Sequence, residues 1–429
     1  MIQRLAAIVY CNASAVRSNT NNGYSLPPAD TGVRLLNWIA DASTFLVHLE
    51  RRFDPFFRRP FDVLFRQFLT DVITALINIQ RKKDGNLKLA EETIQPDEAA
   101  HLEEIITAMG NQMRRLWRAG DFQRGGNTKT HGIVRGEVTI REDLPEHMRR
   151  GIFAQPRTYK AWVRFSGPGP YITPDIDDVG FMSISIKLMG VPGPKLLDDE
   201  KFTQDMFGVS TPTFVTPDTK ANAHLQQWSY KNAQIFHFVN FSQPHVLDLI
   251  MQSLWIQTQS SPLESEYFSC VPYLLGEGQA MQYSVRSRLK TRTRIPRLPL
   301  RPPDNYLRNA MIATLAKQDV EFDILLQVQT DPYRMPIENN AVFWPTRLSP
   351  RVPAAVLRIP QQEFDSPEQF AFSRILSYNP WHCIAEHRPL GNQSRARQRM
   401  YKELSTLRQT MNHVQHYEPT GDEVFPASP

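Results

Sequence analysis

The residues most suited to a chemical role lie near the C-terminus, where Arg374 and Tyr378 stand four positions apart. Residues four apart on a helix share one face, so we expect the guanidinium to lie against the phenol. A nearby cation favours the phenolate over the neutral phenol, whose ordinary pKa is about 10. A phenolate is one of the axial ligands that haem iron takes in proteins. The structural alternative is a buried tyrosine beside an arginine, and this pair alone does not exclude it.

Four more blocks of sequence accompany this pair. In chain order they are Thr130-His-Gly-Ile-Val-Arg-Gly136, Ala161-Trp-Val-Arg-Phe-Ser166, Asp178-Val-Gly-Phe181 with Lys187, and His387-Arg-Pro-Leu-Gly-Asn392. Together with Arg374-Ile-Leu-Ser-Tyr378 they resemble, in order and approximate spacing, the distal, neighbouring-strand and proximal blocks of the haem catalases. The resemblance extends from about residue 127 to residue 395, which favours a shared fold over coincidence.

The resemblance implies a role for each matched residue and haem b as the cofactor. His131 would be the distal acid and base, Ser166 the hydroxyl that orients it, and Tyr378 the axial iron ligand. Arg374 would hold Tyr378 as phenolate. Arg164 and Arg388 would pair with the haem propionates, for which a permanently charged guanidinium fork is suited.

Three departures from the family pattern affect the expected chemistry. Gly208-Val-Ser-Thr-Pro212 stands where catalases carry a distal asparagine, so Val209 or Ser210 replaces an amide that helps to orient peroxide. Thr128 stands where another propionate-binding arginine is expected, and Arg124 or Lys129 could substitute for it. Three extra residues separate Tyr378 from Arg388.

The implied activity is haem-dependent decomposition of hydrogen peroxide to water and oxygen by an oxidoreductase. Two alternatives stay open. One is a peroxidase or isomerase of the same fold that acts on organic or fatty-acid hydroperoxides. The other is a haem-binding protein without turnover. The expected partner is a small peroxide, and a homo-oligomer is allowed.

Helical periodicity predicts the elements at both ends of the chain. Apolar residues recur every three or four positions from Phe61 to Lys82, and a second helix is expected from Pro96 to Arg118, with acids first and bases last. Further helices are expected at Pro244 to Leu254, with Ser242 as N-cap, and at Asn392 to Met411.

The middle of the chain is patterned for strands. From Phe181 to Leu188, Met182, Ile184, Ile186 and Leu188 alternate with Phe181, Ser183, Ser185 and Lys187. Short runs of the same kind appear at 132–141, 158–166, 279–288, 319–330 and 353–359. The predicted class is α+β, and the resemblance specifies an antiparallel β-barrel with one haem per chain. We expect a helical N-terminal arm at 1–120, a haem-binding core at 121–415 with terminal helices, and a tail at 416–429.

Composition supports a folded, water-soluble chain. Hydrophobic residues make up 41% and charged residues 22% of the 429 residues, and no segment reaches the ~18 uninterrupted apolar residues of a membrane-spanning helix. Three widely spaced cysteines, Cys11, Cys270 and Cys383, favour a reducing compartment and a cytoplasmic location. A short apolar run between Arg4 and Ala15 weakly imitates a signal peptide, which leaves export open.

A basic run between residues 286 and 301 contains seven cations and no acid. Such a run is one mark of a nucleic-acid or membrane-surface patch. It lacks the interleaved aromatic residues that would stack on bases, and its prolines indicate an extended surface connection. We therefore expect no nucleic-acid function.

Overall fold

The structure is a computed structural model that describes residues 47–81, 87–178, 180–231, 233–240 and 242–426. The signal-like segment and Cys11 lie outside these ranges. Cys270 and Cys383 are buried free thiols.

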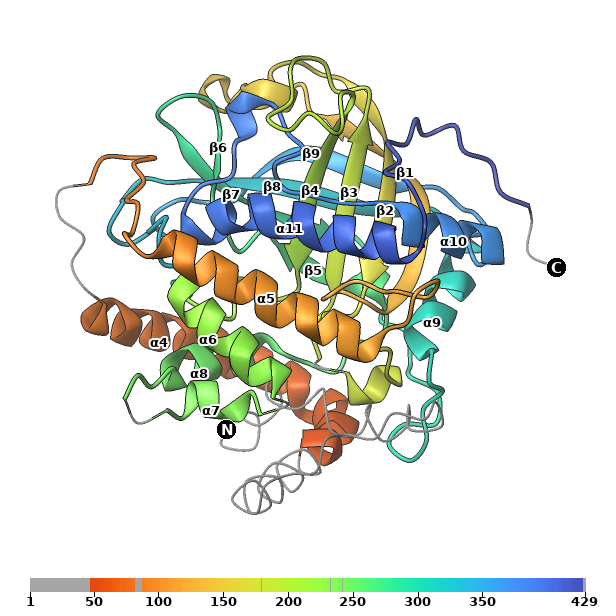
Figure 1. Ribbon diagram of the computed structural model, residues 1–429, viewed down its shortest axis with the longest axis horizontal. Coiled ribbons are helices and arrows are strands. Elements are labelled where there is room, and N and C mark those ends of the chain that lie inside the picture. Colours follow the sequence, from red (N-terminus) through yellow and green to blue (C-terminus); the bar gives the residue numbers. More distant parts are fainter. Residues whose placement is uncertain (1–46, 82–86, 179, 232, 241, 427–429) are drawn as a thin grey trace.

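A closed antiparallel β-barrel forms the centre of the molecule (Figure 1). Its ring runs in the order β5, β4, β3, β2, β1, β9, β8, β7, and it closes because β5 pairs with both β4 and β7. The short strand β6 (Tyr273–Leu274) adds to β7 outside the ring. The ring strands are β1 (Thr130–Ile140), β2 (Thr158–Ser166), β3 (Ser183–Met189), β4 (Thr203–Val209), β5 (Glu266–Phe268), β7 (Ala280–Ser287), β8 (Val320–Val328) and β9 (Val352–Ile359).

The two faces of the barrel wall differ in chemistry. Val163 and Phe165 of β2, together with Ile184 and Ile186 of β3, belong to the apolar core inside the barrel. Because side chains alternate along a strand, their neighbours point outward. The outer wall of β2 and β3 therefore carries Arg164, Ser185 and Lys187, all of them buried under other elements.

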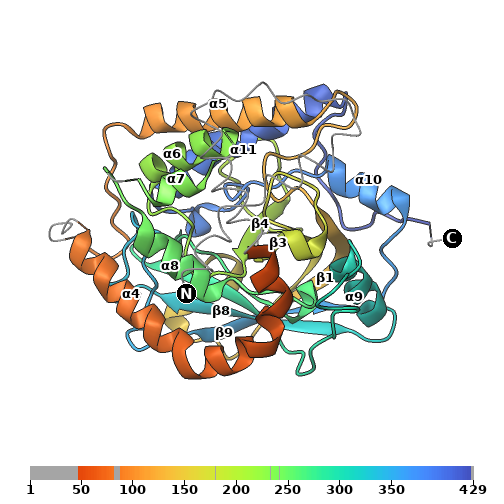
Figure 2. The same cartoon turned by 90° about the horizontal axis from the view of Figure 1, so that it is seen from below.

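Helices cover this outer wall. Helices α5 (Glu98–Leu116), α6 (Thr219–Tyr230) and α11 (Asn392–Met411) pack on one another and form a layer along one side of the barrel (Figure 2). Helices α9 (Tyr306–Leu315) and α10 (Pro367–Ile375) contact β1. Helix α4 (Gln67–Gln80), which continues the π-helical turn η3 (Asp62–Arg66), packs on α8 (Val246–Trp255) beside the short helix α7 (Ile235–Phe238).

Single helical turns connect several of these elements. They are the 3-10 segments η4 (Glu146–Met148), η5 (Gly151–Phe153), η6 (Asp175–Asp177), η7 (Pro262–Glu264) and η8 (Ala385–His387). The last of them lies between Tyr378 and Arg388.

The predicted class and architecture are confirmed, an α+β chain with an antiparallel barrel and helices from both ends of the sequence. One detail is wrong: Ser242 does not cap α8. The N-cap position is His245, and the Ser242 hydroxyl donates to the Asn240 side chain at 2.8 Å instead. None of the helices in the described part of the chain combines the length and apolarity needed to cross a bilayer.

Candidate functional site

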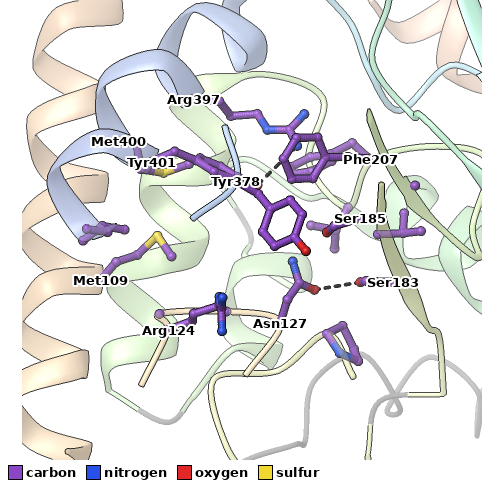
Figure 3. A pocket seen from close by; sticks show the side chains of 18 of the residues that line it. Met109, Arg124, Asn127, Ser183, Ser185, Phe207, Tyr378, Arg397, Met400 and Tyr401 are labelled. Atoms are coloured by element: carbon purple, nitrogen blue, oxygen red, sulfur yellow. Dashed lines mark hydrogen bonds between the residues drawn. The ribbon is translucent and has the colours of Figure 1, made fainter. Parts of the chain in front are cut away.

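A cavity of about 290 Å3 lies between the outer wall of β2 to β4 and the layer of α5, α6 and α11. Apolar residues make up much of its wall, among them Met109, Phe181, Phe207, Val209, Phe214, Met400 and Leu404. Figure 3 shows Tyr378 at its centre, with the phenol oxygen directed into the space between Ser185 and Asn127.

Tyr378 reaches the cavity from an irregular segment that follows α10. The helix ends at Ile375, and Leu376 already has non-helical backbone angles, so Tyr378 is not on a helix. Its side chain is buried, and its hydroxyl has no hydrogen-bond partner in the described part of the chain. Burial raises the pKa of Tyr378 to about 12, although the nearby cations Arg164, Lys187 and Arg124 oppose that rise.

Arg374 does not lie where the four-residue spacing predicted. Because α10 stops between the two residues, the shared helical face does not exist. The Arg374 side chain is exposed at the surface and pairs with Asp121 at 3.2 Å. The expected contact between Arg374 and the phenol is therefore wrong, and buried arginines from other elements stand near Tyr378 instead.

Four arginines line the cavity: Arg124, Arg164, Arg397 and Arg408. Among the described residues of the lining there is no aspartate or glutamate to balance them. Burial together with the neighbouring Arg124 lowers the pKa of Arg164 well below its ordinary value, and burial lowers that of Arg124 to about 10. Buried cations without carboxylates are costly unless an anion joins them, so this cavity is suited to an anionic ligand.

Hydrogen bonds fix these guanidinium groups. Arg164 donates to the Thr130 hydroxyl at 2.8 Å and to the Asn127 carbonyl at 2.6 Å. Arg124 and Arg408 both donate to the Leu376 carbonyl, at 2.7 and 3.1 Å, two residues before Tyr378. The same arginines that face the cavity therefore hold the backbone that presents the phenol.

Arg388 and Lys129, which were also expected near the haem propionates, lie outside the cavity lining. Arg388 does not line the cavity and pairs with Glu92 at 2.7 Å. Lys129 is buried against Asp175 at 2.6 Å. Of the two substitutes named for Thr128, Arg124 lies in the cavity and Lys129 does not.

His131 is fully buried beside the cavity but is not part of its lining. Its Nδ1 atom lies 3.7 Å from Asp175, and neither ring nitrogen has a hydrogen-bond partner within the described residues. The Ser166 hydroxyl is also without a partner there, so the expected bond between Ser166 and His131 is not formed. Burial, with the positive charges of Lys129 and Arg308, lowers the pKa of His131 well below its ordinary value and keeps the ring neutral.

The two residues that stand in place of the expected distal asparagine have different surroundings. Val209 lines the cavity, whereas the Ser210 hydroxyl accepts from the Met182 backbone at 2.8 Å and lies outside the lining. An amide reaches the cavity from another position, because the Asn127 side chain points toward the Tyr378 phenol (Figure 3) and accepts from Ser183 at 2.7 Å. Asn127 has a φ of 52°, a left-handed conformation that asparagine tolerates better than most residues.

A buried charge network supports the chain after Tyr378. Lys187 is paired with Glu200 and with Asp205, the latter at 2.8 Å, and its ammonium lies 5.3 Å from the centre of the Tyr378 ring. Asp205 accepts from the Asn379 backbone and from His382, both at 2.9 Å. Glu200, Asp205 and His382 stand close enough to hold a cation, and the Lys187 ammonium occupies that position.

This network predicts a pH-dependent stability. Burial would lower the pKa of His382, but its hydrogen bonds to Asp199 and Asp205 outweigh that effect and raise it to about 9. A raised pKa stabilises the folded state at low pH, so we expect about 3 kcal/mol of stability to be lost as the pH rises from about 6.5 through 9. Urea unfolding of the wild type and of His382→Gln across this range measures the difference. Equal slopes for both proteins would show that folding does not raise the pKa of His382.

Sequence reasoning missed Asn127, Arg397 and Arg408. A signal was present for the two arginines, because residues 397, 401, 404 and 408 follow helical spacing and place two cations on the same face of α11 as Tyr401 and Leu404. The periodicity does not say which face is buried.

Comparison with solved structures identifies the fold. The chain is similar to a fungal catalase (14% identity, 81% of this chain and 69% of that chain, TM-score 0.55). It is also similar to a bacterial catalase (15%, 80% and 70%, TM-score 0.50) and to catalase A from Saccharomyces cerevisiae (12%, 81% and 72%, TM-score 0.55). No family model and no curated protein sequence matches the chain. At these identities the likeness shows the fold alone.

Proposed function

We propose that this catalase-fold chain binds haem b, with Tyr378 as the axial ligand, and decomposes hydrogen peroxide to water and oxygen. The observation that carries the proposal is the unpartnered, buried phenol oxygen of Tyr378 in a cavity that gathers four arginines and no carboxylate from the described residues. A phenol without a protein partner is suited to an iron ligand. The surplus of cations is suited to a cofactor with two carboxylates.

Different residues would hold the iron, bind the propionates and move the proton. Tyr378 would hold the iron, while Arg164 and Arg124, with Arg397 or Arg408, would bind the propionates in place of the originally expected Arg388. Haem supplies the redox chemistry that cleaves the peroxide bond when it is bound. His131, neutral and therefore able to accept a proton, would take a proton from one peroxide oxygen and return it to the other.

The decisive experiment is to purify the protein with haem supplied, record its absorption spectrum and measure oxygen release on addition of hydrogen peroxide. A tyrosinate-type ferric spectrum together with oxygen release supports the proposal. Failure to bind haem would overturn it. Haem binding without reaction toward any peroxide would leave a haem-binding protein, an alternative that is favoured by the position of His131 outside the cavity lining.

Val209 favours a second candidate, turnover of organic or fatty-acid hydroperoxides. A bulky peroxide is oriented by apolar contacts along its tail, whereas hydrogen peroxide depends on hydrogen bonds such as those of the absent asparagine. Val209→Asn is therefore expected to raise dismutation of hydrogen peroxide several-fold relative to consumption of an alkyl hydroperoxide.

The ratio of oxygen evolution to hydroperoxide consumption measures this change. Ser210→Asn is the matched control, because Ser210 lies outside the lining, and it should leave the ratio unchanged. If Val209→Asn gains nothing and the wild type already matches ordinary catalases, position 209 does not select the peroxide.

A further inference from the structure

The helix that leads into α4 exposes an apolar face along its whole length. Helical residues run from 47 to 80, with the π-helical turn at Asp62–Arg66 in the middle. On the inner side, Ile73 and Ile77 pack against Met251 and Leu254 of α8. The opposite side carries the residues that we call the exposed apolar face: Leu49, Phe53, Phe56, Val63, Leu64, Phe65, Phe68, Val72, Leu76 and Ile79.

The exposure of this face is large for a water-soluble protein. Phe56 is 66% exposed, Phe68 65% and Ile79 77%. Single exposed apolar residues are ordinary, but a continuous row of them on one helix marks a surface that another molecule covers. Figure 2 shows the helix at the lower edge of the molecule, away from the layer of α5 and α11 that covers the cavity.

The basic run at residues 286–301 lies beside this helix. Arg52 donates to the carbonyls of Pro299 and Leu300 at 3.2 and 2.9 Å, and Arg292 lies near enough to Arg66 to lower its pKa. The run therefore follows the helix from its first turns to its π-helical turn. Leu300, at 86% exposed, adds an apolar side chain to the same region.

The cations of the run are directed to solvent. Arg288 is neutralised by Glu321 and Asp323. Within the described residues no ion pair is formed by the remaining exposed cations of the connection, which are Lys290, Arg292, Arg294, Arg297 and Arg301. The surface thus combines a row of large apolar side chains with a strip of unneutralised positive charge.

From this combination we infer that the exposed apolar face and the basic run together form a docking surface for an anionic phospholipid bilayer. Apolar side chains of such a helix enter the boundary between headgroups and acyl chains, and the cations meet the lipid phosphates. A second copy of the chain is the competing occupant, but the strip of unneutralised cations favours an anionic surface over another apolar face. The inference does not depend on haem.

Vesicle sedimentation of the full chain tests the inference. The wild type should bind vesicles of three parts phosphatidylcholine and one part phosphatidylglycerol, and it should release them in 0.5 M NaCl, which screens the attraction. It should bind pure phosphatidylcholine vesicles at least tenfold more weakly. Equal binding to both vesicle types, or binding to neither, overturns the inference.

Two variants separate the two halves of the surface. Lys290→Ser with Arg292→Ser and Arg294→Ser should lower binding to the anionic vesicles roughly 100-fold, since each basic residue near an anionic membrane contributes about 1 kcal/mol. Phe56→Ser with Phe68→Ser should lower it by at least tenfold.

Each variant has a matched control. Lys160→Ser with Arg399→Ser and Lys402→Ser removes three charges from β2 and α11, and Phe202→Ser removes another exposed phenylalanine, 66% exposed. Both controls should bind like the wild type, and a loss equal to that of the test variants overturns the inference. Light scattering gives the remaining outcome: a dimer that Phe56→Ser with Phe68→Ser dissociates, without vesicle binding by the wild type, would assign the face to self-association and also overturn it.

Discussion

Tyr378→Phe is expected to abolish the native haem spectrum while leaving the polypeptide folded. The substitution removes one oxygen atom, and that oxygen has no hydrogen-bond partner among the described residues. Because an unpaired buried hydroxyl costs free energy, the apoprotein should be as stable as the wild type or more stable. Haem, in contrast, should lose its axial ligand. Absorption spectra of the loaded proteins and urea unfolding of the apoproteins measure the two effects separately.

Tyr401→Phe provides the control for this substitution. Tyr401 also lines the cavity, but its hydroxyl accepts from Arg397 at 3.2 Å, so it already has a partner. Haem spectra of Tyr401→Phe and the wild type should agree. If Tyr378→Phe keeps an unchanged spectrum, the axial assignment is wrong, and a spectrum altered by Tyr401→Phe alone would transfer the role to that residue.

His131→Ala is expected to retain haem and to lose peroxide turnover by about 100- to 10,000-fold, the usual contribution of a general acid and base. Burial and the cations around the ring lower its pKa, which keeps the ring neutral with a free nitrogen lone pair and also makes it a weaker base than an exposed histidine. Oxygen evolution per bound haem measures the loss. His131→Gln, which fills more of the buried space, guards against a loss that reflects misfolding.

His237→Gln is the control for His131, since His237 is equally buried and burial likewise lowers its pKa, to about 3. It lies on α7, where it stacks on His245 and contacts His224 instead of the residues around His131, and it should keep full activity. Full activity in both His131 variants would remove this histidine from the mechanism. That result would agree with its place outside the lining and would direct attention to the amide of Asn127.

The alternation of side chains in the strands was predictable from the sequence. Burial of one face of a strand against an apolar core requires period-two patterning, and residues 181–188 have it. The same pattern placed Lys187 on the face opposite Ile184 and Ile186, where it is found. The helices at 98–116 and 392–411 were equally predictable from the sequence, because their periodicity and terminal charges are local properties.

The chemistry around Tyr378 depended on the tertiary structure. The spacing of Arg374 and Tyr378 suggested a helical pair, but α10 ends between them, and helix ends are set by competing tertiary contacts as well as by local propensity. Arg124 and Arg408 donate hydrogen bonds to the Leu376 carbonyl. They lie more than 30 residues from Leu376, one before it and one after it in the chain. No local sequence pattern predicts contacts between segments so far apart.

What the sequence by itself determined is therefore the helices at 98–116 and 392–411, six of the barrel strands and the alternation of their faces, which follow from interactions between near neighbours in the chain. The role of Tyr378 stays a prediction from the resemblance. Closure of the barrel and packing of α5, α6 and α11 on its outer wall decided which cations surround Tyr378. They also decided that Val209 and Asn127 line the cavity and that His131 does not. These outcomes depend on contacts between residues distant in sequence. The surroundings of a buried charge are set by the elements that pack around it, and those elements come from separate parts of the chain.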